Sequence, residues 1–115
     1  MNLSDAFPST PSDGELIHAV AQGDESALAA LYDRYGARLF AFALRMSGDP
    51  HLAEEAVQNA FLSVWRSAGT FDPERSALSP WLITVTKNRT RDLMRARGRK
   101  APPAPLDLDP AAGVA

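Results

Sequence analysis

The segment from Ser79 to Lys100, which reads SPWLITVTKNRTRDLMRARGRK, carries the residues best suited to binding chemistry. Ser79 can cap a helix, Pro80 fits its first position and Gly98 fits its end, so we predict one helix here. At ~100° per residue, five residues share its polar face: Thr84, Lys87, Asn88, Arg91 and Arg95. Cations and an amide on one face can meet phosphates and base edges.

The other face of this predicted helix is a candidate core stripe. It consists of Trp81, Leu82, Val85, Leu93 and Ala96, with Thr86 at its edge. Arg89 interrupts the stripe, where an unpaired guanidinium is costly to desolvate. We expect Arg89 to be at least half buried and paired with Asp92 or with an acid of another helix, and Asp92→Ala to lower stability clearly. The alternative is an Arg89 that reaches solvent along its alkyl stem.

Charge is distributed very unevenly along the chain. Seven of the twelve Lys and Arg residues lie between Trp81 and Lys100 against one acid, which gives a local net charge of +6. The formal net charge of the whole chain is only −2. The positive segment is typical of a surface that attracts anions. A solvated helix whose cations favour its C-terminal end is the simpler alternative.

Length and composition exclude several classes of protein. A chain of 115 residues fits one domain, and its lack of cysteine excludes disulfides and thiolate metal sites. It has neither an apolar run that could span a bilayer nor a signal-peptide pattern, so we expect no membrane insertion and a cytoplasmic location. His18 and His51 are far apart, and no carboxylates cluster at metal-ligand spacing. We therefore expect no catalytic residues, metal or cofactor.

Caps and periodicity predict three further helices and an all-α, compact bundle of about four helices. The predicted helices run from Ser12 to Gly23, from Asp24 to about Ser47 and from Pro50 to about Ala68. Residues 1–11 are expected to form a mobile arm, residues 12–99 the domain, and the Pro-rich residues 100–115 a linker.

The first two of these helices have recurrent apolar positions. The expected core residues are Leu16, Ile17, Ala19, Val20, Leu28, Leu31, Tyr32, Tyr35, Leu39, Phe42 and Met46. Gly36 interrupts the second helix and is expected to mark a close helix crossing.

The third of these helices has a core arc and a separate polar arc. The core arc contains Ala53, Val57, Ala60, Phe61, Val64 and Ala68. The polar arc contains Glu55, Gln58, Asn59 and Arg66, with Leu62 among them. The residues alone leave two readings of Leu62 open: an incidental exposed side chain, or the anchor of a protein-binding patch.

A loop from Gly69 to Ser79 joins the third helix to the basic one. Its apolar residues, Phe71 and Leu78, are expected to tuck under the loop against the core. Alternatively, the loop forms a pocket for an extruded base.

Three stretches together resemble conserved region 2 of a bacterial extracytoplasmic-function (ECF) sigma factor. They are DGELIHAVAQGDESALAALYDRYGARLF, AEEAVQNAFLSVW and FDPERSALSPWLITVTKNRTRDLMRAR, and they cover about Asp13 to Arg99. The resemblance implies a domain that binds the clamp helices of the RNA polymerase β′ subunit. It also implies promoter opening, reading of the minus-ten element as single-stranded non-template DNA, and an anti-sigma partner.

The resemblance also assigns roles to residues. Polymerase contacts fall on Glu55, Gln58 and Asn59, beside Leu62, and the base-capturing loop contributes Phe71, Asp72, Arg75 and Ser76. The family's WLxxIAxN…D…R pattern falls on Trp81, Leu82, Val85, Thr86, Asn88, Asp92 and Arg95. Asn88 and Arg95 are then expected to meet DNA at the upstream edge of the element.

The chain departs from the family pattern in two places. Asn59 stands where the family usually has Glu, and Ser76 and Leu78 replace more typical loop residues. The family's C-terminal helix-turn-helix domain is missing, so we expect a fragment of a longer sigma factor. Two other functions stay open from the residues: a helical domain that binds nucleic acid without regard to sequence, and a helical protein-interaction module that does not bind DNA.

Overall fold

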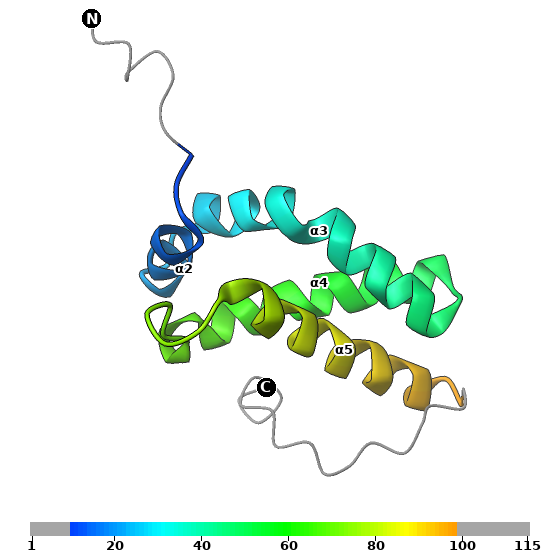
Figure 1. Ribbon diagram of the computed structural model, residues 1–115. Coiled ribbons are helices and arrows are strands. Elements are labelled where there is room, and N and C mark those ends of the chain that lie inside the picture. The colour runs from blue at the N-terminus through cyan, green and yellow to red at the C-terminus, as the bar shows by residue number, and fades with distance from the viewer. Residues whose placement is uncertain (1–9, 99–115) are drawn as a thin grey trace, which may run out of the picture.

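The computed structural model describes residues 10–98, which form four α-helices and one short 3-10 helix (Figure 1). The elements are α2 (Asp13–Ala21), α3 (Glu25–Ser47), α4 (Pro50–Ser67), η1 (Ala68–Thr70) and α5 (Leu78–Ala96). No strand occurs among these residues, so the predicted all-α fold is confirmed. Most of the predicted arm, residues 1–11, and the whole predicted linker, residues 100–115, lie outside the described residues.

The three long helices run back and forth beside one another, and α2 lies at one end of them (Figure 1). Helix α5 packs against both α3 and α4, while α2 packs against α3 and η1. Within the described residues we find no helix with the length and apolarity that crossing a membrane requires. Because it packs against both α3 and α4, helix α5 is buried on two sides.

Side-chain caps fix where the first three helices begin, as the sequence predicts. Ser12 Oγ accepts a hydrogen bond from the Glu15 backbone N–H at 3.0 Å, and Glu15 Oε1 accepts one from the Ser12 N–H at 2.9 Å. Asp24 caps α3, and Asp49 caps α4 ahead of Pro50. These bonds satisfy N–H groups that have no partner within a helix, so the start of each helix is set locally.

Helix α5 begins earlier than expected. Its first residue is Leu78 and its N-cap is Ala77, with no side-chain cap, so the prediction of Ser79 as cap was wrong. Leu78 is only 3% exposed, and its burial in the core places the chain in helical geometry before Ser79. Pro80 is tolerated because N–H groups in a first helical turn have no intrahelical partner. The end near Gly98 is confirmed: Arg97 is the C-cap, and Gly98 has φ 71°.

The core joins all four helices and η1. Its main cluster contains Leu16, Ile17, Val20, Ala27, Leu31, Tyr35, Leu39, Val57, Phe61, Val64, Ala68, Leu78 and Leu82. The predicted core arc of α4 is confirmed in full, since all of its residues are buried. Apolar area removed from water contributes roughly 25 cal/mol per Å², so this cluster dominates the stability of the domain.

Two residues that were expected in the core, Tyr32 and Ala96, are exposed. Tyr32 is 46% exposed, because it lies at the edge where α3 meets α4 and not between them. At Gly36, an added Cβ would lie 3.3 Å from the ring of Tyr32 on the same helix, and the expected helix crossing stays a prediction. Ala96 is exposed because it lies in the last turn of α5, beyond the helices that cover the rest of that face.

Candidate nucleic-acid and protein interfaces

The cationic face of α5 is present, with three basic side chains along it. Lys87 and Arg91 are partly exposed and Arg95 is exposed. Thr84, predicted on the same face, is partly exposed, but its hydroxyl donates to the Pro80 carbonyl oxygen at 3.0 Å. The face therefore offers cations to a ligand, while Thr84 Oγ1 already has a partner within the helix.

Asn88 does not lie on this face, so its predicted placement was wrong. It is 6% exposed, because α5 packs against two helices and its buried arc is wider than a single stripe. Thr86 and Thr90 are buried in the same way, with hydroxyls that donate to the carbonyl oxygens of Leu82 (2.8 Å) and Thr86 (2.7 Å). Such bonds to the preceding turn let polar residues lie in a helix core.

Arg89 and Arg95 flank the same carboxylate on α5. Arg89 Nη2 lies 3.5 Å from Asp92 Oδ2, and Arg95 Nη1 lies 3.9 Å from Asp92 Oδ1. The Arg89 side chain is 17% exposed, which confirms the expectation that it is at least half buried, and of the two expected partners the structure has Asp92. Asp92 therefore connects a core-facing arginine to an arginine of the cationic face.

The loop before α5 turns tightly and packs against the core. Phe71 lies against Trp81, with ring centroids 4.8 Å apart and planes at 34°, and Leu78 is buried, so the expected tucking of both is confirmed. Asp72 Oδ1 accepts the Glu74 N–H at 2.9 Å, which holds the turn. Arg75 and Ser76 are exposed at the surface of the loop.

The polar arc of α4 places Leu62 in solvent, as its periodicity predicts. Leu62 is 52% exposed, and Glu55, Gln58 and Asn59 lie on the preceding turns of the same helix. Glu55 is ion-paired with Arg97 at the end of α5. Caps and periodicity do not predict that contact, because Glu55 and Arg97 are far apart in the chain.

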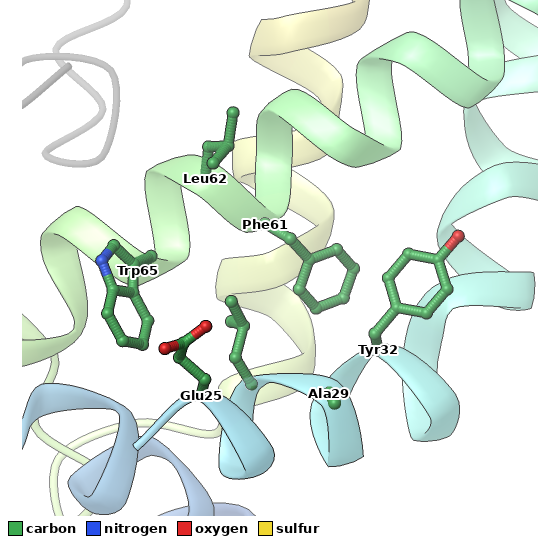
Figure 2. A pocket seen from close by; sticks show the side chains of 7 residues that line it. Glu25, Ala29, Tyr32, Phe61, Leu62 and Trp65 are labelled. Atoms are coloured by element: carbon green, nitrogen blue, oxygen red, sulfur yellow. The ribbon is translucent and has the colours of Figure 1, made fainter. Parts of the chain in front are cut away.

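Beside Leu62, a groove of about 490 Å³ runs between α3 and α4 (Figure 2). It is lined by Glu25, Leu28, Ala29, Tyr32, Phe61, Leu62 and Trp65. The rings of Tyr32 and Phe61 lie beside one another in Figure 2, and their centroids are 5.1 Å apart. The most exposed large apolar residues of the described chain, Tyr32 and Leu62, both line this groove. An apolar groove with an exposed aliphatic side chain at its border is typical of a protein-docking site.

A smaller, more polar hollow lies on the other side of Leu62. Its volume is about 280 Å³, and its lining comes from α4 and α5 and includes Asn59, Arg66, Arg89 and Asp92. Leu62 is thus a ridge between an apolar groove and a charged hollow. The periodicity of α4 predicts that Leu62 is exposed, but it predicts neither the apolar groove nor the charged hollow beside it.

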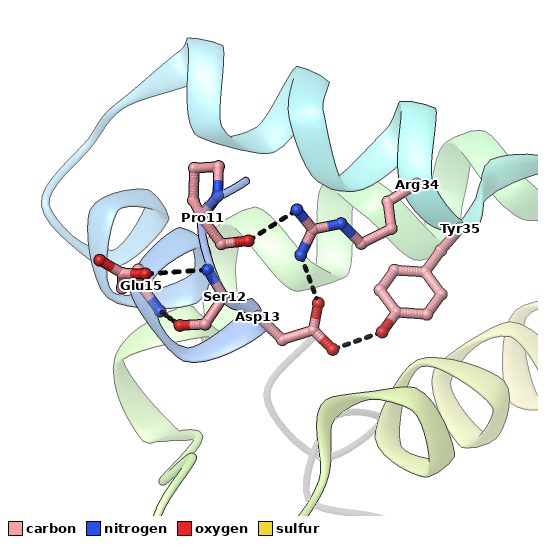
Figure 3. Close-up of polar contacts among 6 residues, drawn as sticks. All are labelled: Pro11, Ser12, Asp13, Glu15, Arg34 and Tyr35. Carbon is pink, nitrogen blue, oxygen red and sulfur yellow. Dashed lines mark hydrogen bonds and ion pairs between the residues drawn. The ribbon is translucent and has the colours of Figure 1, made fainter. Parts of the chain in front are cut away.

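A cluster of polar contacts fixes α2 against α3 (Figure 3). The Asp13 carboxylate accepts from Arg34 Nη1 at 2.8 Å and from the Tyr35 hydroxyl, and Arg34 Nη2 donates to the Pro11 carbonyl oxygen at 2.7 Å. Burial raises the pKa of Tyr35, and its hydrogen bond to Asp13 raises that pKa further. Tyr35 thus stays protonated as a donor, and α2 is held in a defined position.

Comparison with known proteins agrees with this arrangement. The family model for sigma-70 region 2 matches residues 31–100. The chain therefore belongs to the sigma-70 region 2 family.

Three similar proteins are ECF sigma factors with the name SigK. ECF RNA polymerase sigma factor SigK of Mycobacterium sp. strain KMS is 41% identical over 81 residues, which are 70% of this chain and 42% of that protein. SigK of Mycolicibacterium vanbaalenii is 38% identical over 81 residues, which are 70% of this chain and 41% of that protein. SigK of Mycobacterium tuberculosis is 31% identical over 103 residues, 86% of this chain and 55% of that protein. The chain thus spans about half the length of these relatives.

Proposed function

We propose that this chain is the part of an ECF sigma factor that binds core RNA polymerase and recognises the promoter minus-ten element as single-stranded non-template DNA. One observation carries the proposal: a single small domain exposes Leu62 beside an apolar groove between α3 and α4, and it also exposes cationic side chains along α5. A single domain can then hold polymerase and DNA at once. Such a role places the protein in the cytoplasm, where polymerase acts.

The polymerase partner is the pair of clamp helices of the β′ subunit. Leu62 projects between two hollows, so a helical partner can place side chains on both sides of it. Glu55, Gln58 and Asn59 supply an acid and two amides beside this anchor. A buried aliphatic anchor with polar groups around it is the usual arrangement of a binding hot spot.

The DNA partner is held by charge and selected by base capture. Lys87, Arg91 and Arg95 attract phosphates, and the loop with Phe71, Asp72, Arg75 and Ser76 receives unstacked bases. Unstacking a base costs a few kcal/mol, and stacking on an aromatic ring returns ~1–3 kcal/mol per base. Promoter opening is then favourable only on sequences whose unstacked bases fit.

Separation of the two activities tests the proposal. Purified chain is mixed with core RNA polymerase and a labelled single strand of minus-ten type, and both complexes are measured by mobility shift. Leu62→Asp is expected to lose polymerase and keep DNA, whereas the double variant Lys87→Ala, Arg91→Ala is expected to lose DNA and keep polymerase. Loss of both activities in either variant contradicts two separate surfaces.

The burial of Asn88 favours a second candidate function, a domain that binds nucleic acid without regard to sequence. With Asn88 inside the protein, the exposed face of α5 carries cations and no free amide. Phosphate contacts alone position a protein but do not select a sequence. Equal affinity for minus-ten-type and scrambled single strands would establish this second function and exclude the first.

A further inference from the structure

The charged hollow between α4 and α5, on one side of Leu62, has charges that do not balance. Two arginines line it, Arg66 of α4 and Arg89 of α5, against the carboxylate of Asp92. Asn59, which also lines the hollow, is neutral. Two cations against one carboxylate leave a net charge of +1 on this lining, so the hollow attracts an anion.

Asp92 compensates the charge of Arg89 only in part. Arg89 Nη2 lies 3.5 Å from Asp92 Oδ2, whereas a strong hydrogen bond between a guanidinium and a carboxylate is ~2.7–2.9 Å long. The carboxylate is also shared, because Arg95 Nη1 lies 3.9 Å from Asp92 Oδ1. Among the described residues, the buried Nε of Arg89 has no hydrogen-bond partner. The hollow thus has at its wall a mostly buried arginine whose charge is incompletely neutralised.

We propose that the charged hollow receives a carboxylate side chain of the polymerase clamp helices that dock at Leu62, and that Arg66 and Arg89 hold this carboxylate. The inference rests on the proposed function and deepens it, because it names the chemistry of the side chain that accompanies the contact at Leu62. The polymerase contacts expected from the sequence all lie on α4, whereas Arg89 makes α5 part of the polymerase site.

The position of the hollow fits a helix that crosses Leu62. The apolar groove lies on one side of Leu62 (Figure 2) and the charged hollow on the other. Side chains three or four positions apart lie on the same face of a helix. One helix of the partner can therefore place an apolar side chain in the groove and an acidic side chain in the hollow. With a volume of about 280 Å³, the hollow has room for a carboxylate side chain.

The orientation of α5 favours a protein carboxylate over a DNA phosphate in this hollow. An α-helix turns ~100° per residue, so Lys87 and Arg91, each two positions from Arg89, point ~160° away from it. Neither of them lines the hollow. A strand that follows Lys87 and Arg91 therefore lies on the other side of α5. The planar fork of an arginine also matches a carboxylate, with which it can form two parallel hydrogen bonds.

The rate of dissociation from core RNA polymerase tests the inference. Arg66→Gln removes one cation from the hollow at an exposed position, where substitutions change stability little. We expect it to weaken polymerase binding about tenfold or more, mainly through faster dissociation, because an enclosed charge pair loses one partner. Single-stranded DNA binding should stay unchanged. Arg45→Gln, at an exposed position in the last turn of α3, removes the same charge away from the hollow and should bind polymerase as the parent does.

A charge swap identifies the partner carboxylate. Arg66→Glu should weaken polymerase binding more than Arg66→Gln does, because it places like charges against one another. Core polymerases in which single acidic residues of the clamp helices are replaced by Lys are then tested with Arg66→Glu. We expect one of them to restore binding of Arg66→Glu and to bind the parent chain less well. Arg45→Glu is the matched control, and no polymerase variant should improve its binding.

The outcomes separate this inference from the proposed function. The inference is overturned if both Arg66 variants bind polymerase as the parent does while Leu62→Asp does not bind, and the proposed function then stands. It is also overturned if no lysine substitution in the clamp helices restores Arg66→Glu, or if Arg66→Gln loses DNA and keeps polymerase. If the parent and Leu62→Asp bind polymerase equally well, docking at Leu62 is wrong, and the inference fails together with the proposed function.

Discussion

In α5, Arg89 Nη2 lies 3.5 Å from Asp92 Oδ2, one turn further along the helix. The two partners differ in burial, since the Arg89 side chain is 17% exposed and that of Asp92 is 54% exposed. The buried Nε of Arg89 has no hydrogen-bond partner among the described residues. The exposed carboxylate of Asp92 thus compensates the positive charge of Arg89, whose side chain is mostly buried. Asp92 also lies 3.9 Å from Nη1 of Arg95, a residue of the cationic face.

Asp92→Asn is expected to lower the free energy of unfolding by at most ~1 kcal/mol, because a pair with one partner in solvent is worth much less than a buried pair. The clear destabilisation that a buried pair implies is therefore not expected. For a domain of this size, the melting temperature should fall by no more than ~4–8 °C. Thermal unfolding measures this, and a larger fall would show that the pair acts as a buried one.

The same substitution is expected to change DNA binding in two opposite ways. Removal of a negative charge beside Arg95 raises affinity for any single strand. Loss of a carboxylate that positions Arg95 lowers the preference for minus-ten-type over scrambled strands. Titrations of both strands with Asp92→Asn measure the two effects separately, and an unchanged ratio would remove the positioning role.

Leu62→Asp is expected to weaken binding to core polymerase by at least ~30-fold, since a hot-spot anchor is worth roughly 2 kcal/mol or more. Because Leu62 is 52% exposed, the melting temperature should stay close to that of the parent. Ala41→Asp, at an exposed position of α3, is the matched control for an added charge. Normal polymerase binding by Leu62→Asp would place the polymerase site elsewhere.

Neighbouring residues of α5 should respond differently to alanine. Lys87→Ala and Arg91→Ala are each expected to weaken single-strand binding and to reduce the slope of log affinity against log salt by ~0.7. Asn88→Ala is instead expected to destabilise the fold by ~1–3 kcal/mol, because a buried polar contact is lost. Salt titrations and thermal unfolding distinguish the two outcomes. If the Asn88→Ala variant is stable and loses only its preference between sequences, Asn88 contributes to DNA recognition.

Acid should unfold the domain partly through its helix caps. The hydrogen bond from the Ser26 side chain, followed by that from the Ala27 N–H, lowers the pKa of Asp24. A carboxyl whose pKa is lower in the folded state stabilises the fold above its ordinary pKa of ~3.9, and this contribution is lost as the pH falls through the folded value.

Asp24→Asn isolates this effect, because Asn also caps helices but does not titrate. We expect the variant to show a smaller loss of melting temperature between neutral pH and pH ~3 than the parent does. Parallel melts over that range provide the measurement. Identical pH profiles would mean that other carboxyls govern acid unfolding.

Local sequence determined where the first three helices begin and which residues of α4 face solvent. Ser12, Asp24 and Asp49 cap helices through backbone groups within one turn, so the sequence suffices to place these helix starts. Leu62 was located by helical periodicity alone, because α4 keeps one side open to solvent although it packs against both α3 and α5.

Tertiary packing decided the features that lie between elements. Asn88 is buried because α5 packs against both α3 and α4, and a helical wheel cannot show how many neighbours surround a helix. The groove beside Tyr32 and the charged hollow between Arg66 and Arg89 join segments that are distant in the chain. Caps and periodicity depend on residues within a few positions of one another, whereas a shared surface depends on the angles and spacing at which whole helices pack.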